Sequence, residues 1–401
     1  MTNSKSSLNQ SFFIAVLTLI GIFSASSSPI PLLGVFRDRL NILSTDLAYT
    51  AVVYFLGCCV ALLFLSRISN SIGRKRATIG ALILGLIAVI IFMFVPNFTL
   101  LLTARFIHGL ACGIASSSIM SYIIDTAPNN NKALASFFNI CGPAMGFCIG
   151  CGLSTASVLV FDIEIYNIYI ILSLIHFVLI GLVIYKCEET VNINYKKLFK
   201  LLTPKLEVPK KFLPFVIATS VLFITTWSIG GFFQSFITVL TEESLHLPST
   251  FSGVFFIIFI GAQTIGGLIS QKINPIKCTV IFLVIYFVLT PLLFTVAYYQ
   301  MVILFSIICF IMGFASTAAG TAVISLTVNG STVEQRPGIM ATCYFVAYIG
   351  AGGPNLIIGR YFKDIDINNV FVGYSLLTVS FGILSLFILA WAIKAKERTI
   401  A

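Results

Sequence analysis

Long apolar segments alternate with short polar ones along the entire chain. A helix that crosses the hydrocarbon core of a bilayer needs about 20 apolar residues, because that core is about 30 Å thick. The pattern predicts an all-α membrane protein with 12 transmembrane helices. We place these helices at residues 12–34, 46–66, 77–95, 99–123, 134–159, 166–185, 213–239, 249–270, 278–297, 300–326, 338–359 and 370–393.

The composition supports this class. Hydrophobic residues make up 58% of the chain and charged residues only 9%, whereas soluble domains contain about 25% charged residues. An open sheet would leave unpaired backbone groups in lipid. A membrane β-barrel would show alternating segments of ~10 residues, which this sequence lacks. The spans are therefore helical.

The basic residues indicate the orientation of the chain. Nineteen of the 24 Lys and Arg residues fall in alternate polar segments, four fall in the others, and Arg105 lies within a helix. Since Lys and Arg accumulate on the cytoplasmic side, we expect both termini in the cytoplasm. These cations lie between apolar segments and not on a soluble face, so no nucleic-acid partner is expected despite the net charge of +10. Frequent Ile, Asn and Lys and short loops favour a bacterial inner membrane.

The longest polar interruption divides the chain. It covers residues 186–212, separates an N-terminal six-helix bundle (1–185) from a C-terminal one (213–401), and contains seven Lys residues. This cytoplasmic linker is either an amphipathic stretch on the inner leaflet or a solvated connection.

The sequence contains no pattern that predicts an enzyme, a cofactor or a metal. Cys148 and Cys151 form a C-x-x-C pair without a second pair or a neighbouring His, so no zinc site is expected. The sequence also lacks a nucleotide-binding loop and a Ser/His/Asp constellation. We therefore expect neither catalysis nor a bound cofactor.

The loop between the second and third spans carries a motif. Residues 66–76 read Ser-Arg-Ile-Ser-Asn-Ser-Ile-Gly-Arg-Lys-Arg. Gly73 permits a tight turn with positive φ, and the following cations lie at a helix end. The loop resembles the G-x-L-A-D-R-x-G-R-R signature of the major facilitator superfamily. Gly73, Arg74 and Lys75 match this signature, whereas Ser66, Asn70 and Ser71 replace its Gly, Asp and Arg.

Residues 267–274 repeat the motif in a degraded form after the eighth span, with Lys277 following. This repeat strengthens the resemblance, which implies two pseudo-symmetric six-helix halves that alternate access to a central site.

The fourth span resembles the family pattern L-x-x-x-R-x-x-Q-G, with His108 in place of Gln. An Arg within a membrane helix is costly unless it faces a wet cavity or a partner, so Arg105 is either a cavity residue or an interfacial anchor. His108 lies on the same helix face. Histidine changes charge near physiological pH, and His108 is therefore a candidate for proton coupling.

The fifth span contains Gly142-Pro143-Ala-Met-Gly146. It resembles the G-P-x-x-G-G motif of the drug/proton antiporter branch, although Phe147 replaces the last Gly. Pro143 permits a bend, and small residues allow close helix contact. Ordinary small-residue packing is the alternative interpretation.

The resemblance implies a cavity lined mainly by helices 1, 4, 7 and 10. The predicted substrate or coupling residues are Arg105, His108, Trp227, Gln234, Asn139 and Ser28. The predicted gating residues are Gly73, Arg74, Lys75, Asp125, Gly142, Pro143 and Gly146. All 14 acidic residues fall at helix ends or in loops, and Asp125 is positioned to pair with Arg74.

Two functional hypotheses remain. The first is secondary active, proton-coupled efflux of a small organic molecule by alternating access, in which protons, the substrate and the lipid bilayer are the partners. The alternative is uptake or exchange of a metabolite anion, with Arg105 as a carboxylate clamp. The protein is expected to act as a monomer.

Overall fold

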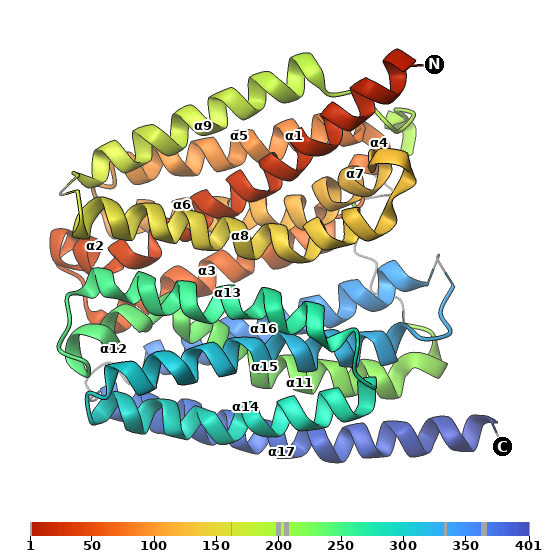
Figure 1. Cartoon of the computed structure of the whole chain (residues 1–401). Coiled ribbons are helices and arrows are strands. Elements are labelled where there is room, and N and C mark those ends of the chain that lie inside the picture. Colours follow the sequence, from red (N-terminus) through yellow and green to blue (C-terminus); the bar gives the residue numbers. More distant parts are fainter. Residues whose placement is uncertain are drawn as a thin grey trace. The chain divides into compact units, whose positions relative to one another are not determined.

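The computed structural model describes residues 2–161, 163–197, 202–203, 208–332, 335–361 and 367–400. Within these ranges the chain forms helices joined by short connections, and no strand occurs there (Figure 1). The predicted all-α class is confirmed. The remaining residues, among them 198–201 and 204–207 of the predicted linker, lie outside this description.

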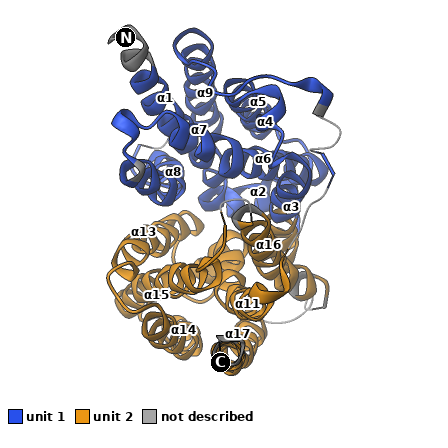
Figure 2. Ribbon diagram, turned by 90° about the vertical axis from the view of Figure 1, so that its right-hand side faces the viewer, with its two compact units in different colours: residues 1–42, 53–204 blue, residues 43–52, 205–401 orange. Residues whose placement is uncertain are grey.

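The chain divides into two compact units (Figure 2). Unit 1 contains residues 1–42 and 53–204, and unit 2 contains residues 43–52 and 205–401. The domain boundaries at 186 and 212 stay a prediction.

The helices of unit 1 begin with α1 (Thr2–Ser27), which a short 3-10 turn joins to α2 (Leu33–Leu40). A π-helical segment (Ala61–Leu65) extends α3 (Leu47–Val60), and a second one (Ala115–Ile119) joins α6 (Phe98–Ile114) to α7 (Met120–Asp125). The first six residues of α3 belong to unit 2. The other helices of unit 1 are α4 (Ser69–Ile72), α5 (Arg74–Met93), α8 (Lys132–Leu159) and α9 (Ile165–Lys186).

Unit 2 contains a second series of long helices. These are α11 (Leu213–Ser235), α13 (Ser252–Ser270), α14 (Pro275–Tyr298), α15 (Val302–Val328), α16 (Arg336–Tyr361) and α17 (Ile367–Ile400), with the short α12 (Ile237–Glu243) after α11.

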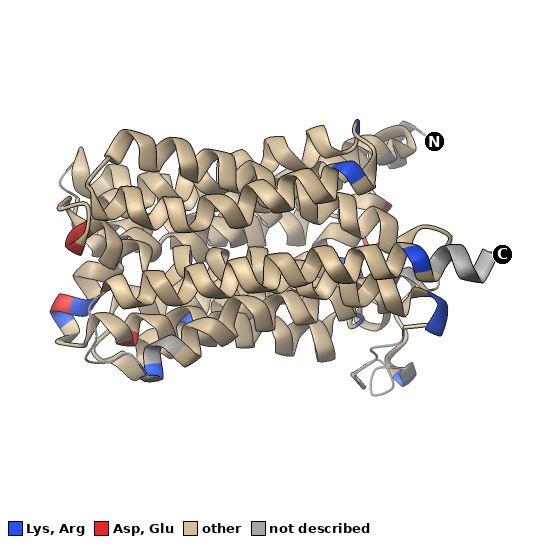
Figure 3. Ribbon diagram, turned by 90° about the horizontal axis from the view of Figure 1, so that it is seen from below, with Lys and Arg blue, Asp and Glu red and all other residues tan. Residues whose placement is uncertain are grey.

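Eleven helical segments in the described part of the chain are long and apolar enough to cross a membrane. The predicted segment 338–359 forms α16, which is not among these eleven. The count of 12 transmembrane helices therefore stays a prediction. Large apolar side chains are exposed on the long helices, including Phe177, Ile303 and Phe387, which suits a surface solvated by lipid. Lys, Arg, Asp and Glu lie mostly at helix ends (Figure 3).

The two units repeat the same helix neighbours. In unit 1, α1 packs on α8 and α9, and α5 packs on α6 and α9. In unit 2, α11 packs on α16 and α17, and α14 packs on α15 and α17. We match α1, α5, α6, α8 and α9 in order with α11, α14, α15, α16 and α17. Each of the four helix pairs named for unit 1 then has its counterpart in unit 2. This correspondence agrees with the internal repeat seen in the sequence.

Glycines bring paired helices into backbone contact in both units. A Cβ atom at Gly109 of α6 would collide with the carbonyl oxygen of Tyr54 in α3. In unit 2, a Cβ atom at Gly313 of α15 would collide with the carbonyl oxygen of Phe259 in α13. Because lipid tails are as apolar as the helices, association within a membrane depends on such close packing.

The glycines of α8 make a similar contact with α1. A Cβ atom at Gly146 would lie 2.6 Å from the Phe23 Cβ, and one at Gly150 would collide with the Ser24 carbonyl oxygen. The hydroxyls of Ser24 and Ser27 donate to the carbonyl oxygens of Gly146 (3.0 Å) and Phe147 (2.9 Å). The predicted motif therefore forms the α1–α8 contact. Its Pro143 lies inside α8, which continues through it, and a Cβ atom at Gly142 would lie 2.8 Å from Leu19.

We predict that Gly150→Ala destabilises the protein, because the added methyl group overlaps backbone and side-chain atoms of α1. Overpacking of this kind costs about 1–3 kcal/mol. The measurement is the midpoint of thermal unfolding in detergent. Gly181→Ala is the matched control, since a Cβ atom there has nothing within 4 Å. Equal midpoints for both variants would contradict the prediction.

Candidate functional site

Arg105 lies in the interior of unit 1. Its side chain is 0% exposed, and Nη1 donates a hydrogen bond to the Ser26 carbonyl oxygen at 2.8 Å. Its guanidinium carbon lies 4.8 Å from the ring centroid of Tyr54, which gives a cation–π contact. The Arg105 side chain therefore does not reach the surface of unit 1, and its role as a cavity residue stays a prediction. Residues of α1 and α3 contact this buried cation of α6.

His108 lies one turn further along α6 and is 1% exposed. Its ring stacks on Phe92 of α5 with centroids 5.3 Å apart, and Phe92 stacks in turn on Tyr169 of α9 at 5.4 Å. Neither ring nitrogen of His108 has a hydrogen-bond partner among the described residues. The structure thus places Arg105 and His108 close together but leaves the imidazole nitrogens unused.

Two of the other predicted substrate residues donate hydrogen bonds to backbone carbonyl groups. The Ser28 hydroxyl donates to the Ala25 carbonyl oxygen of its own chain turn at 2.8 Å. The Asn139 amide donates to the Met120 carbonyl oxygen at 3.1 Å and so connects α8 with α7. Neither of these two hydrogen bonds involves Arg105.

Trp227 belongs to an aromatic cluster in unit 2. Its ring is half-buried and lies 5.3 Å from Tyr348 and 6.0 Å from Tyr344, both on α16. Phe223, one turn before Trp227, contacts Tyr344 at 6.0 Å. Gln234 is buried two turns after Trp227 on the same helix. Tyr344 and Tyr348 are not among the predicted substrate residues, although their spacing of four residues places both on one helix face.

The motif loop has the predicted turn. Gly73 has φ 99°, which favours glycine, and it precedes the first residue of α5. The Arg74 Nε lies 2.9 Å from the Asp125 Oδ2 at the end of α7, so the predicted pairing is confirmed. The Lys75 side chain extends to α9, where its Nζ donates a hydrogen bond to the Ile184 carbonyl oxygen at 2.7 Å. The gating role of these residues stays a prediction.

A second carboxylate, Glu189, completes this loop. Its Oε1 accepts hydrogen bonds from the backbone N–H groups of Arg74 at 2.6 Å and Thr190 at 3.1 Å. An anion at the N-terminus of α5 is stabilised by the helix dipole. A Cβ atom at Gly73 would collide with this carboxylate. Gly73 is thus required both for its backbone angle and for the space that Glu189 occupies.

The start of the predicted linker lies against unit 1 through further contacts. The Ser71 hydroxyl donates to the Asn194 carbonyl oxygen at 2.6 Å, and the Asn194 N–H donates to the Ser71 carbonyl oxygen at 2.9 Å. The Tyr122 hydroxyl donates to the Glu188 carbonyl oxygen. These bonds join segments more than 60 residues apart in sequence, which is why sequence spacing did not reveal them.

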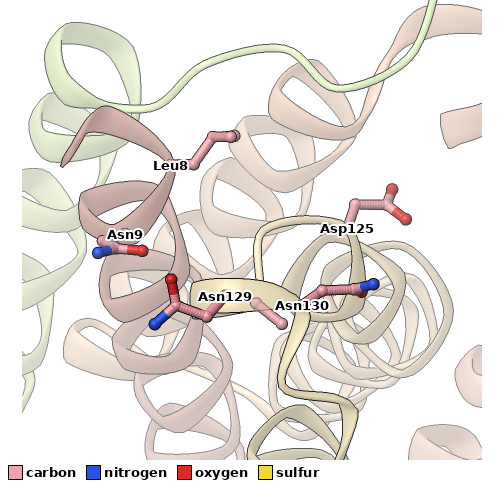
Figure 4. Close-up of a pocket in the computed structure, with 6 residues that line it drawn as sticks. Leu8, Asn9, Asp125, Asn129 and Asn130 are labelled. Atoms are coloured by element: carbon pink, nitrogen blue, oxygen red, sulfur yellow. The ribbon is translucent and has the colours of Figure 1, made fainter. Parts of the chain in front are cut away.

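Two hollows lie at helix ends. One of about 530 Å³ is lined by Leu8, Asn9, Asp125, Ala127, Asn129 and Asn130 of unit 1 (Figure 4). The other, of about 520 Å³, is lined by Glu243, Ser244, His246, Tyr298, Gln300, Ile367 and Asn368 of unit 2. Neither contains a predicted substrate residue.

These features define a polytopic membrane protein with two related helical units and polar groups inside them. The chain belongs to the Major Facilitator Superfamily, whose family model matches residues 12–354. Members of this family are transporters. The resemblance seen in the motifs is confirmed, and the protein is a member of this family of membrane transporters.

Individual relatives match over shorter stretches. The chain is 24% identical over 146 residues to the Quinolone resistance protein NorA of Staphylococcus aureus (strain MRSA252), which covers 36% of this chain and 38% of that protein. It is 31% identical over 99 residues to the Uridine/deoxyuridine transporter of Lactococcus lactis subsp. cremoris (strain MG1363), which covers 24% of this chain and 21% of that protein.

We predict that Glu189→Gln loosens the contact between the linker and the N-terminus of α5. Replacing a charged acceptor at a helix N-terminus by a neutral one costs about 1 kcal/mol, which corresponds to about fivefold faster opening. Hydrogen exchange of peptides that contain Arg74 and Thr190 measures this opening. Glu188→Gln is the matched control, because hydrogen bonds of Glu188 involve its backbone. Similar exchange in both variants would contradict the prediction.

Proposed function

We propose that this protein exports a small organic molecule, such as a drug, metallophore or metabolite, across a bacterial inner membrane in exchange for protons. Membership of a transporter family supports the class of activity. The relative named for quinolone resistance supports the direction, since a transporter that confers resistance lowers the concentration of a drug inside the cell.

The observation that carries the proposal is the aromatic cluster of Trp227, Tyr344 and Tyr348. These half-buried rings lie on two neighbouring helices of unit 2. Aromatic faces contribute stacking contacts of about 0.5–1.5 kcal/mol beyond burial. Trp and Tyr also carry a polar group that can bond to a ligand. Such a surface suits a flat, largely apolar organic molecule better than a small inorganic ion.

We assign the proton-coupling role to His108, since the sequence places no carboxylate in the middle of a span. Its unpartnered ring nitrogens can bond to water and pass a proton on. Arg105, one turn away, supplies a fixed positive charge whose interaction with a proton on His108 is repulsive.

Alternating access is proposed to use the bundles 1–185 and 213–401, joined by the linker 186–212, with both termini in the cytoplasm. The α1–α8 contact of Gly142, Pro143 and Gly146 would then adjust during the cycle. The pair of Arg74 and Asp125 would hold one state closed. A single chain contains both bundles, so a monomer is the expected functional unit.

The buried charge of Arg105 favours a second candidate function, which is uptake or exchange of a metabolite anion. A guanidinium offers five N–H donors in a geometry that matches a carboxylate. In that case Arg105 would clamp the anion, and protons would not need to move in the opposite direction.

Proteoliposomes with an acidic interior distinguish the two candidates. If the protein exchanges protons for substrate, a fluoroquinolone added outside raises the internal pH, because each molecule that enters is exchanged for protons. Liposomes with the Trp227→Ala protein are the control for passive diffusion of the drug, and we expect their internal pH to change at least about tenfold more slowly, as the loss of two stacking contacts implies. Carboxylate uptake without a pH change would instead support the second candidate.

Trp227 also reports binding directly. The chain contains two Trp residues, and the other, Trp391, is 50% exposed on α17. In a Trp391→Phe protein, we predict that a bound aromatic compound quenches Trp227 fluorescence with saturation. The Trp227→Phe protein, which retains Trp391, serves as the control for absorption by the compound. Saturable quenching of Trp391 alone would contradict the assignment of the site to Trp227.

A further inference from the structure

Several buried polar side chains inside unit 1 carry atoms that have no hydrogen-bond partner among the described residues. His108 of α6 and His176 and Ser173 of α9 are all buried. Four of their atoms lack a hydrogen-bond partner among the described residues, namely the His108 Nδ1 and Nε2, the Ser173 Oγ and the His176 Nε2. We call these three residues the polar seam.

Contacts with α5 show where His108 and His176 lie along the length of that helix. His108 stacks on Phe92, and a Cβ atom at Gly85 would lie 2.8 Å from the His176 Nε2. Gly85 and Phe92 are separated by two helical turns, or about 10 Å. Ser173 lies on the same face of α9 as His176, one turn earlier. The polar seam therefore extends for about two turns between α5, α6 and α9.

Four unsatisfied buried atoms are too many for a dry interior. A buried polar atom without a hydrogen-bond partner destabilises the fold, so four of them together favour a partner that is not part of the chain. A buried water molecule needs two to four polar partners. The atoms of the polar seam are partners of this kind, and they include both donors and acceptors.

The tautomer of His176 follows from its one hydrogen bond. The His176 Nδ1 lies 2.9 Å from the Leu172 carbonyl oxygen. A carbonyl oxygen only accepts, so the Nδ1 carries the hydrogen and donates it. In the neutral ring, the Nε2 then bears a lone pair. This lone pair belongs to the unpartnered atom that lies against Gly85.

The charged and titratable neighbours are unevenly distributed along the polar seam. Arg105 is the cation beside His108, and Tyr54 and Cys58 of α3, Cys112 of α6 and Tyr169 of α9 surround that cation. The nearest residues of α5 are Gly85 and Phe92, which do not titrate. Repulsion from Arg105 falls with distance, so a proton is better tolerated at His176 than at His108.

We propose that the polar seam holds water and carries the coupling proton along its two helical turns in unit 1, with the His176 Nε2 as the atom that binds it. This inference rests on the proton coupling proposed above. Water delivers a proton to the Nε2 lone pair, the ring becomes an imidazolium that keeps its bond to Leu172, and the same nitrogen later returns the proton to water. Ser173 bonds to the water between His108 at one end and the His176 Nε2 at the other.

Deuterium exchange at the C2 position of histidine tests whether water reaches the polar seam. This exchange requires both contact with solvent and a protonated ring, and the chain has three histidines. The third, His246, is exposed just after the end of α12 and is the internal reference. In proteoliposomes in D₂O, we expect His176 to exchange within about tenfold of His246. Exchange of His176 more than a hundredfold slower than His246 would overturn the proposal.

His176→Gln tests whether the proton uses this route. Gln keeps a polar group but does not bind a proton, so we expect substrate-driven proton movement to fall at least about tenfold while quenching of Trp227 by the compound persists. His246→Gln is the matched control, and the midpoint of thermal unfolding checks folding. Full proton movement in His176→Gln would overturn the polar seam alone. Absence of proton movement in the unaltered protein would instead overturn the proton coupling of the proposed function.

Discussion

The structure depends on one constraint, which is that lipid provides no hydrogen bonds to the polar groups of a protein. Helices satisfy their own backbone, and most buried hydroxyls bond to the preceding turn, as Ser28 and Thr226 do. Other polar groups bond to a neighbouring helix, as the hydroxyls of Ser24 and Ser27 do, and these bonds mark helix contacts. The polar seam contains atoms without a partner among the described residues, and such atoms are candidate sites for water.

Close packing of backbones is the second consequence of the apolar surroundings. Gly109 against Tyr54 and Gly313 against Phe259 bring equivalent helix pairs into contact in the two units. The hydrophobic effect does not drive helices together within lipid, so the stabilisation comes from dispersion across these short distances. Both units contain such glycine contacts, and both repeat the same helix neighbours.

Sequence motifs predicted some features of the site correctly. The turn at Gly73 and the close contact of Gly146 could be inferred because each belongs to a local pattern. The pairing of Arg74 with Asp125 could be inferred because both residues lie at ends of spans on the same predicted side of the membrane. The role of Glu189 could not, since its partner Arg74 lies 115 positions away in the chain. The role proposed for His176 could not be inferred either, because nothing in the sequence of α9 shows that one of its ring nitrogens lacks a partner.

The sequence by itself determined the class of the protein, since the length of its apolar segments matches the thickness of a bilayer and its cations lie between them. It also determined where turns and close contacts occur, because Gly and Pro impose these locally. The tertiary structure alone decided which side chains meet. A helix that is apolar on all sides, such as α5 or α9, has no face that its sequence marks as inward. Its rotation is set by the packing of neighbouring helices, and only that rotation brings His108, Phe92 and Tyr169 into one stack.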